Sequence, residues 1–333
     1  MTAVFVSNPA DRLDMFYGPR ALAGLRELAT VRLNPHEREL SVAELAREAA
    51  DCEVVVAYRG TAGTAELFGA LPRLKAFVRC ATDIRNIDLA AAAADGVLVT
   101  RTGAGFAAAV AEWVMGVLVD LSRGISAHAA GYHAGVVPQP VMGRELRGSV
   151  LGVIGYGLIG REVARLAQAF GMQVLAADPR QAVGNGARQV ELPVLLAQSD
   201  AVVCLATATE ETENLMDARA FSAMKPGAFF LNASRGNLVD EQALRAALDS
   251  GHLAGCALDV GRAPDQMPSP ELARHPRVIA TPHIGGLTRP ATDYQALETV
   301  RQVRDILAGR VPQGAVNAEQ AHRFTGSVAG ERG

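Results

Sequence analysis

The sequence predicts an α/β protein with two doubly wound domains, each a parallel sheet with helices on both faces. Short apolar runs alternate with helical stretches in two successive series along the 333 residues. The second series begins with a strand that runs directly into a glycine-rich turn and a helix. At about 150 residues per domain, the length also suggests two domains.

The first series occupies the N-terminal hundred residues. Ser41, with Glu44 three residues later, has the pattern of a capping box that opens a helix. Residues 54–57 are continuously apolar, which is typical of a strand covered on both faces. We expect strands at 4–6, 31–33, 54–57, 74–78 and 97–100, and helices at 21–29, 42–50 and 87–94.

The second series follows a long helical pattern over residues 107–132, which we take as the boundary between the domains. We expect strands at 150–154, 173–177, 201–205, 228–232, 255–259 and 278–281. A last helix is expected at 291–308, and the pattern alone assigns it to neither series.

Composition excludes several classes of function. The chain has 32 Lys and Arg residues against 35 Asp and Glu, so it lacks the basic excess of proteins that bind nucleic acids or anionic membranes. No apolar run approaches the roughly 20 residues of a membrane helix, and the opening lacks the pattern of a signal peptide. Four scattered cysteines form no CxxC pair, so we expect no metal site, a reducing environment and a cytoplasmic location.

The glycine-rich turn has the GxGxxG spacing of a dinucleotide-binding loop. Gly155 allows the tight turn, Gly157 lets a pyrophosphate approach the backbone, and Gly160 lets helix and strand pack closely. The N–H groups at the start of the following helix favour an anion. The motif comprises Gly155, Tyr156, Gly157, Leu158, Ile159 and Gly160.

Asp178 ends the next strand and is followed by Pro179 and Arg180. A carboxylate there accepts hydrogen bonds from the ribose of NAD and repels the 2′-phosphate of NADP. Arg180 weakens this preference, because a nearby guanidinium tolerates a phosphate. We nevertheless predict NAD as the cofactor.

Three further polar segments end predicted strands, at residues 232–236 (NASRG), 257–260 (ALDV) and 281–286 (TPHIGG). Together with GYGLIG at 155–160, they give the chain a clear resemblance to the D-isomer-specific 2-hydroxyacid dehydrogenases. The resemblance covers nearly the whole chain and includes Asn86–Asp88, Val110–Glu112 and Glu211–Thr212.

The resemblance implies a Rossmann NAD-binding domain at 102–286, inserted into a flavodoxin-like catalytic domain at 1–101 and 287–333. It implies hydride transfer between nicotinamide and C2 of a 2-hydroxy or 2-oxo acid. Family members are mostly dimers, so a homodimer is expected, with the long helix that carries Trp113 as an interface element.

The resemblance also assigns residue roles. Arg235 would bind the substrate carboxylate with its fork of donors, and His283 would be the acid–base group, since imidazole titrates near neutral pH. Asp259 would hold the nicotinamide carboxamide. The remaining cofactor contacts would come from Ala206, Thr207, Thr212, Ala233, Ser234, Gly285 and Gly286.

The sequence departs from the family at the partner of His283. Family members usually have a Glu five residues after the Asp of LDV, where it orients the histidine, but this chain has Pro264. Asp265 replaces that Glu if the loop shifts by one residue, and Glu271 is a poorer candidate.

The second departure is in the substrate loop. Where the family has a glycine-rich turn, this chain has Ala81, Thr82, Asp83 and Arg85. Arg85 either contacts the substrate or simply pairs with Asp83 or Asp88. Residues Tyr58, Arg59 and Gly60 match another substrate-facing segment, where Arg59 either binds a second anionic group or is solvated.

Two alternatives remain open. The chain could be an NAD(H)-binding regulatory protein that has lost catalysis, which only the missing Glu favours. A formate- or phosphite-type oxidation ranks last, since the chain lacks the extra length of formate enzymes.

Overall fold

The structure is a computed structural model that describes residues 2–324, apart from the side chain of Asp265. It divides into two compact units, Met1–Gly105 with Thr288–Gly333, and Phe106–Leu287. The division falls four residues after the predicted boundary at residue 101 and one residue after that at 286. Over the described residues, no helix combines the length and the apolar character needed to cross a membrane.

Unit 1 contains a five-stranded sheet in the order β2-β1-β3-β4-β5, in which every strand pair is parallel. This is the order of flavodoxin-like domains. The strands are β1 (Ala3–Val6), β2 (Thr30–Leu33), β3 (Val54–Ala57), β4 (Ala76–Arg79) and β5 (Leu98–Arg101).

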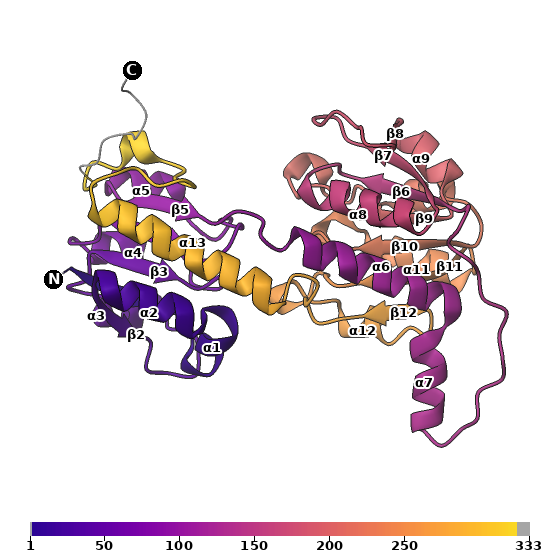
Figure 1. The fold of residues 1–333 in the computed structure, drawn as a ribbon, viewed down its shortest axis with the longest axis horizontal. Coiled ribbons are helices and arrows are strands. Elements are labelled where there is room, and N and C mark those ends of the chain that lie inside the picture. Colours follow the sequence, from indigo (N-terminus) through magenta and orange to yellow (C-terminus); the bar gives the residue numbers. More distant parts are fainter. Residues whose placement is uncertain (1, 325–333) are drawn as a thin grey trace. The chain divides into compact units, whose positions relative to one another are not determined.

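Helices cover both faces of this sheet (Figure 1). Successive residues of β1 point to opposite sides: Val4 and Val6 pack with α2 (Gly18–Leu28) and α13 (Arg289–Leu307), whereas Phe5 packs with α3 (Val42–Glu48) and α4 (Ala65–Ala70). The short helices α1 (Leu13–Phe16) and α5 (Leu89–Ala94) complete the unit. The predicted capping box of Ser41 and Glu44 is confirmed.

Unit 2 contains a seven-stranded parallel sheet in the order β12-β11-β10-β9-β6-β7-β8. Counted from β6, this is the 3-2-1-4-5-6 order of Rossmann domains with one further edge strand. The strands are β6 (Val150–Ile154), β7 (Gln173–Ala177), β8 (Arg188–Gln189), β9 (Ala201–Cys204), β10 (Ala228–Asn232), β11 (Leu253–Leu258) and β12 (Val278–Ala280).

Two helix layers bury this sheet. One contains α6 (Ala107–Arg123) and α8 (Leu158–Ala169). The other contains α9 (Leu192–Gln198), α10 (Ala218–Ala223), α11 (Glu241–Asp249) and α12 (Pro270–Ala273). The predicted fold class, two parallel-sheet α/β domains, is therefore confirmed.

The prediction of one helix over residues 107–132 is wrong. Gly124 adopts a left-handed conformation with φ of 64°, which ends α6, and a separate helix α7 (Ile125–His133) follows. Glycine at this position ends helices because it has no Cβ to oppose that conformation. The last predicted helix is α13, which packs against α2 and β4 of unit 1.

The four cysteines are free, and Cys52, Cys204 and Cys256 are buried. These three thiols lie in the apolar cores of the two units.

Candidate active site

The glycine-rich loop follows β6 and leads into α8. Gly155 has φ of 94°, and a Cβ there would meet the backbone of Leu205 at 2.7 Å. A Cβ on Gly160 would stand 2.2 Å from the carbonyl oxygen of Gly155. At Gly157, by contrast, a Cβ would meet no atom within 4 Å, so the backbone there is open to a ligand. These three glycines therefore fit a bound dinucleotide pyrophosphate.

Asp178 organises the end of β7. One of its oxygens accepts a hydrogen bond from the backbone N–H of Tyr156 at 2.7 Å. The other accepts from the backbone N–H groups of Arg180 at 2.8 Å and Gln181 at 2.9 Å. The Tyr156 side chain is buried, and its hydroxyl donates to the carbonyl of Gly184 at 2.7 Å. Asp178 thus ties the glycine-rich loop to the segment expected to bind the ribose.

Predicted cofactor residues also lie after β9 and β10. Thr212 Oγ1 donates to the carbonyl of Thr207 at 2.8 Å, which closes the turn after β9. Ser234 Oγ donates to the carbonyl of Ala206 at 2.5 Å and joins the two loops. Ala233 donates its N–H to the carbonyl of Cys204.

Two further predicted cofactor residues lie after β6, where Leu158 and Ile159 begin α8.

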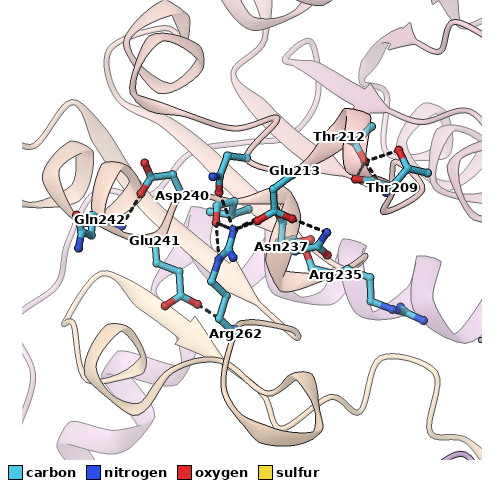
Figure 2. Close-up of polar contacts among 12 residues, drawn as sticks. Thr209, Thr212, Glu213, Arg235, Asn237, Asp240, Glu241, Gln242 and Arg262 are labelled. Carbon is cyan, nitrogen blue, oxygen red and sulfur yellow. Dashed lines mark hydrogen bonds and ion pairs between the residues drawn. The ribbon is translucent and has the colours of Figure 1, made fainter. Parts of the chain in front are cut away.

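Arg235 follows a turn built by Asn232 at the end of β10. The buried Asn232 side chain accepts from the N–H of Ser234 at 3.0 Å and donates to the carbonyl of Arg235 at 3.0 Å. The guanidinium of Arg235 donates to the carbonyl of Ser234 at 2.8 Å. Figure 2 shows this side chain extending away from the neighbouring cluster around Arg262.

Arg262 holds the Arg235 loop against the loop after β11 (Figure 2). Its guanidinium donates to the carbonyls of Asn237 and Val239, to Glu213 at 2.8 Å and to Asn214 at 2.6 Å. The two loops also touch through backbone, because a Cβ on Gly236 would stand 2.1 Å from Gly261. Arg262 belongs to no local motif, so the sequence does not identify it as part of this site.

His283 lies in a loop that the carboxylate of Asp259 holds. Asp259 is buried and accepts hydrogen bonds from Thr281 Oγ1 at 2.6 Å, Ile284 N–H at 2.8 Å and Gly285 N–H at 2.8 Å. The backbone carbonyl of Asp259 accepts from the N–H of His283 at 3.0 Å. Gly286 follows, and a Cβ there would meet Phe106 at 3.2 Å.

Pro264 occupies the start of the short 3-10 helix Pro264–Gln266, where the family carries its Glu. The predicted contact between Asp265 and His283 lies outside the described residues. Glu271 is 80% exposed in its side chain and pairs with Arg245. Its carboxylate is therefore engaged on the surface.

A buried arginine holds the segment after β3, which the resemblance predicts to face the substrate. Arg79 is fully buried and donates to the carbonyls of Tyr58, Arg59 and Thr61, at 2.5, 2.7 and 2.7 Å. Burial lowers the pKa of Arg79 to about 10, which leaves it charged at neutral pH. Gly60 lies close to the side chain of Glu39, since a Cβ built on Gly60 would stand 2.2 Å from the Glu39 carboxylate.

The loop after β4 contains an ion pair. Arg85 donates to both oxygens of Asp83, at 2.7 Å for its shortest contact, and this interaction raises the pKa of Arg85. Asp88 instead caps α5 through the N–H of Ala91. Ala81 accepts from the N–H of Thr102, and Thr82 donates to the carbonyl of Gly103.

Known proteins with similar sequences or folds clarify these sites. A family model described as the NAD binding domain of D-isomer specific 2-hydroxyacid dehydrogenases matches residues 115–285. The D-3-phosphoglycerate dehydrogenase of Sus scrofa is 35% identical over 289 residues, 85% of this chain and 54% of the relative. The chain therefore spans about half the length of that relative.

An (S)-sulfolactate dehydrogenase of Chromohalobacter salexigens is 37% identical over 251 residues, 74% of this chain and 81% of the relative. The solved structure of a glyoxylate reductase from Paecilomyes thermophila matches with a TM-score of 0.82 and 26% identity, over 96% of this chain and 99% of that one.

Unit 2 is thus an NAD-binding domain, by its strand order, its glycine-rich loop and the family model that covers it. The chain belongs to the D-isomer-specific 2-hydroxyacid dehydrogenase family, as the resemblance implied.

Proposed function

We propose that the protein is an NAD-dependent oxidoreductase that interconverts a 2-hydroxy acid and its 2-oxo acid. When bound, the cofactor accepts a hydride at nicotinamide C4 as NAD in the oxidation and donates it as NADH in the reduction. Arg235 binds the substrate carboxylate, and His283 exchanges a proton with the C2 oxygen.

One observation carries this proposal: Arg235 and His283 follow β10 and β12 of the same sheet, each in a loop fixed by a buried side chain. Asn232 shapes the first loop and Asp259 the second. Parallel α/β sheets bind ligands at the carboxyl ends of their strands. The glycine-rich loop after β6 lies at this same end.

The chemistry assigned to each residue follows from its donors. The planar guanidinium of Arg235 grips a carboxylate with two hydrogen bonds and polarises the adjacent carbonyl. In reduction, His283 donates a proton to the C2 oxygen as hydride reaches C2, and in oxidation it accepts that proton. Asp259 is proposed both to orient the His283 loop and to contact the nicotinamide carboxamide.

For the cofactor, we propose contacts from the 155–160 loop, from Asp178, Pro179 and Arg180, and from the loops after β9, β10 and β12. The residues of those loops are Ala206, Thr207, Thr212, Ala233, Ser234, Gly285 and Gly286. Asp178 favours NAD(H), because its carboxylate repels a 2′-phosphate.

For the rest of the substrate, we propose contacts from unit 1. The residues are Tyr58, Arg59, Gly60, Ala81, Thr82, Asp83 and Arg85. Two relatives are named for phosphoglycerate and sulfolactate, acids with a second anionic group. Arg59 is the residue that we assign to such a group.

The test is NADH oxidation with a panel of 2-oxo acids that includes glyoxylate, phosphohydroxypyruvate and sulfopyruvate. Turnover that is abolished in His283→Gln supports the proposal. NADH binding without turnover on any acid, at high enzyme concentration, would instead favour the regulatory alternative, which the presence of Pro264 suggests.

We also propose a cytoplasmic homodimer. None of the residues of α7 is buried, and this helix projects from the end of α6 (Figure 1). Exposed apolar side chains gather on α7 and the segment after it: Ile125, Tyr132, Val136, Val137, Val141 and Met142. Such a patch marks an interaction surface, and a second copy is its proposed occupant. Light scattering, which measures the mass in solution, tests this assignment. The wild type should be a dimer and Val137→Glu a monomer, so a dimeric variant would contradict the assignment.

A further inference from the structure

We propose that Trp113 is a positioning residue for His283, acting through the side chains of Thr281 and Asp259. The inference rests on the proposed acid–base role of His283. It concerns a residue of α6 that belongs to none of the motifs of the sequence.

The three side chains form one continuous chain of hydrogen bonds. Trp113 Nε1 donates to Thr281 Oγ1 at 3.1 Å, and Thr281 Oγ1 donates to Asp259 Oδ1 at 2.6 Å. Asp259 also accepts from the N–H groups of Ile284 and Gly285, both at 2.8 Å. The loop is therefore held on both sides of His283, at 281 and at 284–285.

The indole of Trp113 sets the donor-to-acceptor direction of these hydrogen bonds. An indole N–H can only donate, whereas a hydroxyl can donate or accept. With Trp113 donating to its oxygen, the Thr281 hydroxyl presents its hydrogen to Asp259. Hydrogen bonds aligned in this way strengthen one another, and the one to a carboxylate is the stronger kind.

The loop requires such support because His283 has an unusual backbone. Its φ is 56°, in the left-handed region that residues other than glycine rarely adopt. Conformations of this kind persist only where the surroundings enforce them. Without its anchors, the loop would relax and the imidazole would leave its working position.

Trp113 is a firm anchor because the helix beneath it is fixed. Its neighbours Val110 and Val114 are buried in the core that joins α6 to the sheet. The indole also stands against the loop itself, as a Cβ on Gly285 would lie 3.7 Å from its ring. Contact and hydrogen bond together fix the position of Thr281, and thereby of Asp259 and the histidine loop.

The test compares wild-type enzyme with Trp113→Phe, which keeps an aromatic ring and removes the donor. We expect kcat for a 2-oxo acid to fall about tenfold, the size of one lost hydrogen bond to an ordered group. The affinity for NADH should stay within about twofold, and the pH–rate profile should change. Met115→Leu, a packing change on the same helix, should leave kcat and the pH profile unaltered.

Thr281 supplies the matched pair of variants. Thr281→Val should lower kcat at least as far as Trp113→Phe does, whereas Thr281→Ser, which keeps the hydroxyl, should restore most of it. In the Thr281→Val background, Trp113→Phe should have no further effect, since the acceptor is already absent. Because Trp113 is the only tryptophan, its fluorescence should change in Thr281→Val and remain as in wild type in Thr281→Ser.

The outcomes separate this inference from the function on which it rests. A wild-type enzyme without turnover on any 2-oxo acid overturns the proposed function. An active wild type with an equally active Trp113→Phe, or with additive losses in the double variant, overturns the role of Trp113 alone.

Discussion

Gly285 donates its backbone N–H to Oδ2 of Asp259 at 2.8 Å, and a Cβ built on Gly285 would stand the same 2.8 Å from that oxygen. The carboxylate therefore approaches the loop so closely that no side chain fits between them. Asp259 acts here as the support of the segment that carries His283.

We expect Gly285→Ala to push the Asp259 carboxylate aside and weaken its hydrogen bonds with the loop. Disturbing buried hydrogen bonds costs about 1–3 kcal/mol, so kcat should fall about tenfold or more. Steady-state kinetics measure the effect, with Gly116→Ala as the control. Gly116 lies in α6, outside the proposed site, and a Cβ there would meet no atom within 4 Å. Equal activities of the two variants would contradict the role given to Asp259.

Arg235→Lys should lose substrate binding and retain cofactor binding. Lysine carries the charge but cannot reproduce the two-pronged contact with a carboxylate. We expect kcat/KM to fall at least thirtyfold, about 2 kcal/mol, with an unchanged dissociation constant for NADH by fluorescence titration. Near-normal turnover would show that another cation binds the carboxylate.

Asp178 should make the enzyme select NADH over NADPH. Two like charges at about 4 Å repel each other by about 1 kcal/mol in water and by more where they are partly desolvated. We therefore expect at least tenfold weaker binding of NADPH, and Asp178→Ser should narrow the difference. Asp178→Asn is the control for loss of the acceptor, because it removes the charge but keeps an oxygen that accepts from the Tyr156 N–H. Tighter binding of NADPH by the wild type would refute the assignment.

Glu213 gives a prediction for stability against pH. Hydrogen bonds from Asn237 and Arg262 lower the pKa of Glu213 below its ordinary value of 4.5. Because the folded-state pKa is the lower one, the stabilisation is complete above the ordinary pKa and is lost as the pH falls through the lowered value. The difference in Tm between wild type and Glu213→Gln should be constant from pH 7 to about 5 and shrink below that. A difference independent of pH would show that this carboxylate contributes no charge to the cluster.

The fold could be predicted because its signals are local. A strand, a glycine-rich turn and a helix follow one another within residues 150–169, and each of them formed as expected. The sequence does not predict the two-residue strand β8 or the helices α9–α12, which have four to nine residues, since such short elements carry little periodicity. The break at Gly124 was also missed, because the helical pattern continues on both sides of it.

The supports of the site could not be predicted for a different reason. Trp113 and Thr281 are separated by 168 residues and Arg262 and Glu213 by 49, so no spacing in the sequence connects them. Motifs identify Arg235 and His283, which the resemblance places at a reaction centre. They are silent on the side chains that hold these loops, because many arrangements can serve that purpose.

Pro264 stands at the position where the family carries a glutamate that partners the histidine. A carboxylate beside an imidazole favours its protonated form, which is the acid needed to reduce a 2-oxo acid. We therefore expect the rate of reduction by the wild type to fall, with rising pH, at a lower midpoint pH than that of Pro264→Glu. The Pro264→Glu variant should reduce 2-oxo acids faster than the wild type at neutral pH. If Asp265 replaces the missing glutamate, Asp265→Asn should move the midpoint pH still lower. Glu271→Gln should leave it in place, because that side chain is exposed and paired with Arg245. The pH dependence of kcat, measured for the four proteins with one 2-oxo acid, separates these cases. A midpoint shared by wild type and Asp265→Asn would exclude Asp265 as the partner. A midpoint unmoved in Pro264→Glu would show that a carboxylate at this position does not act on His283 at all.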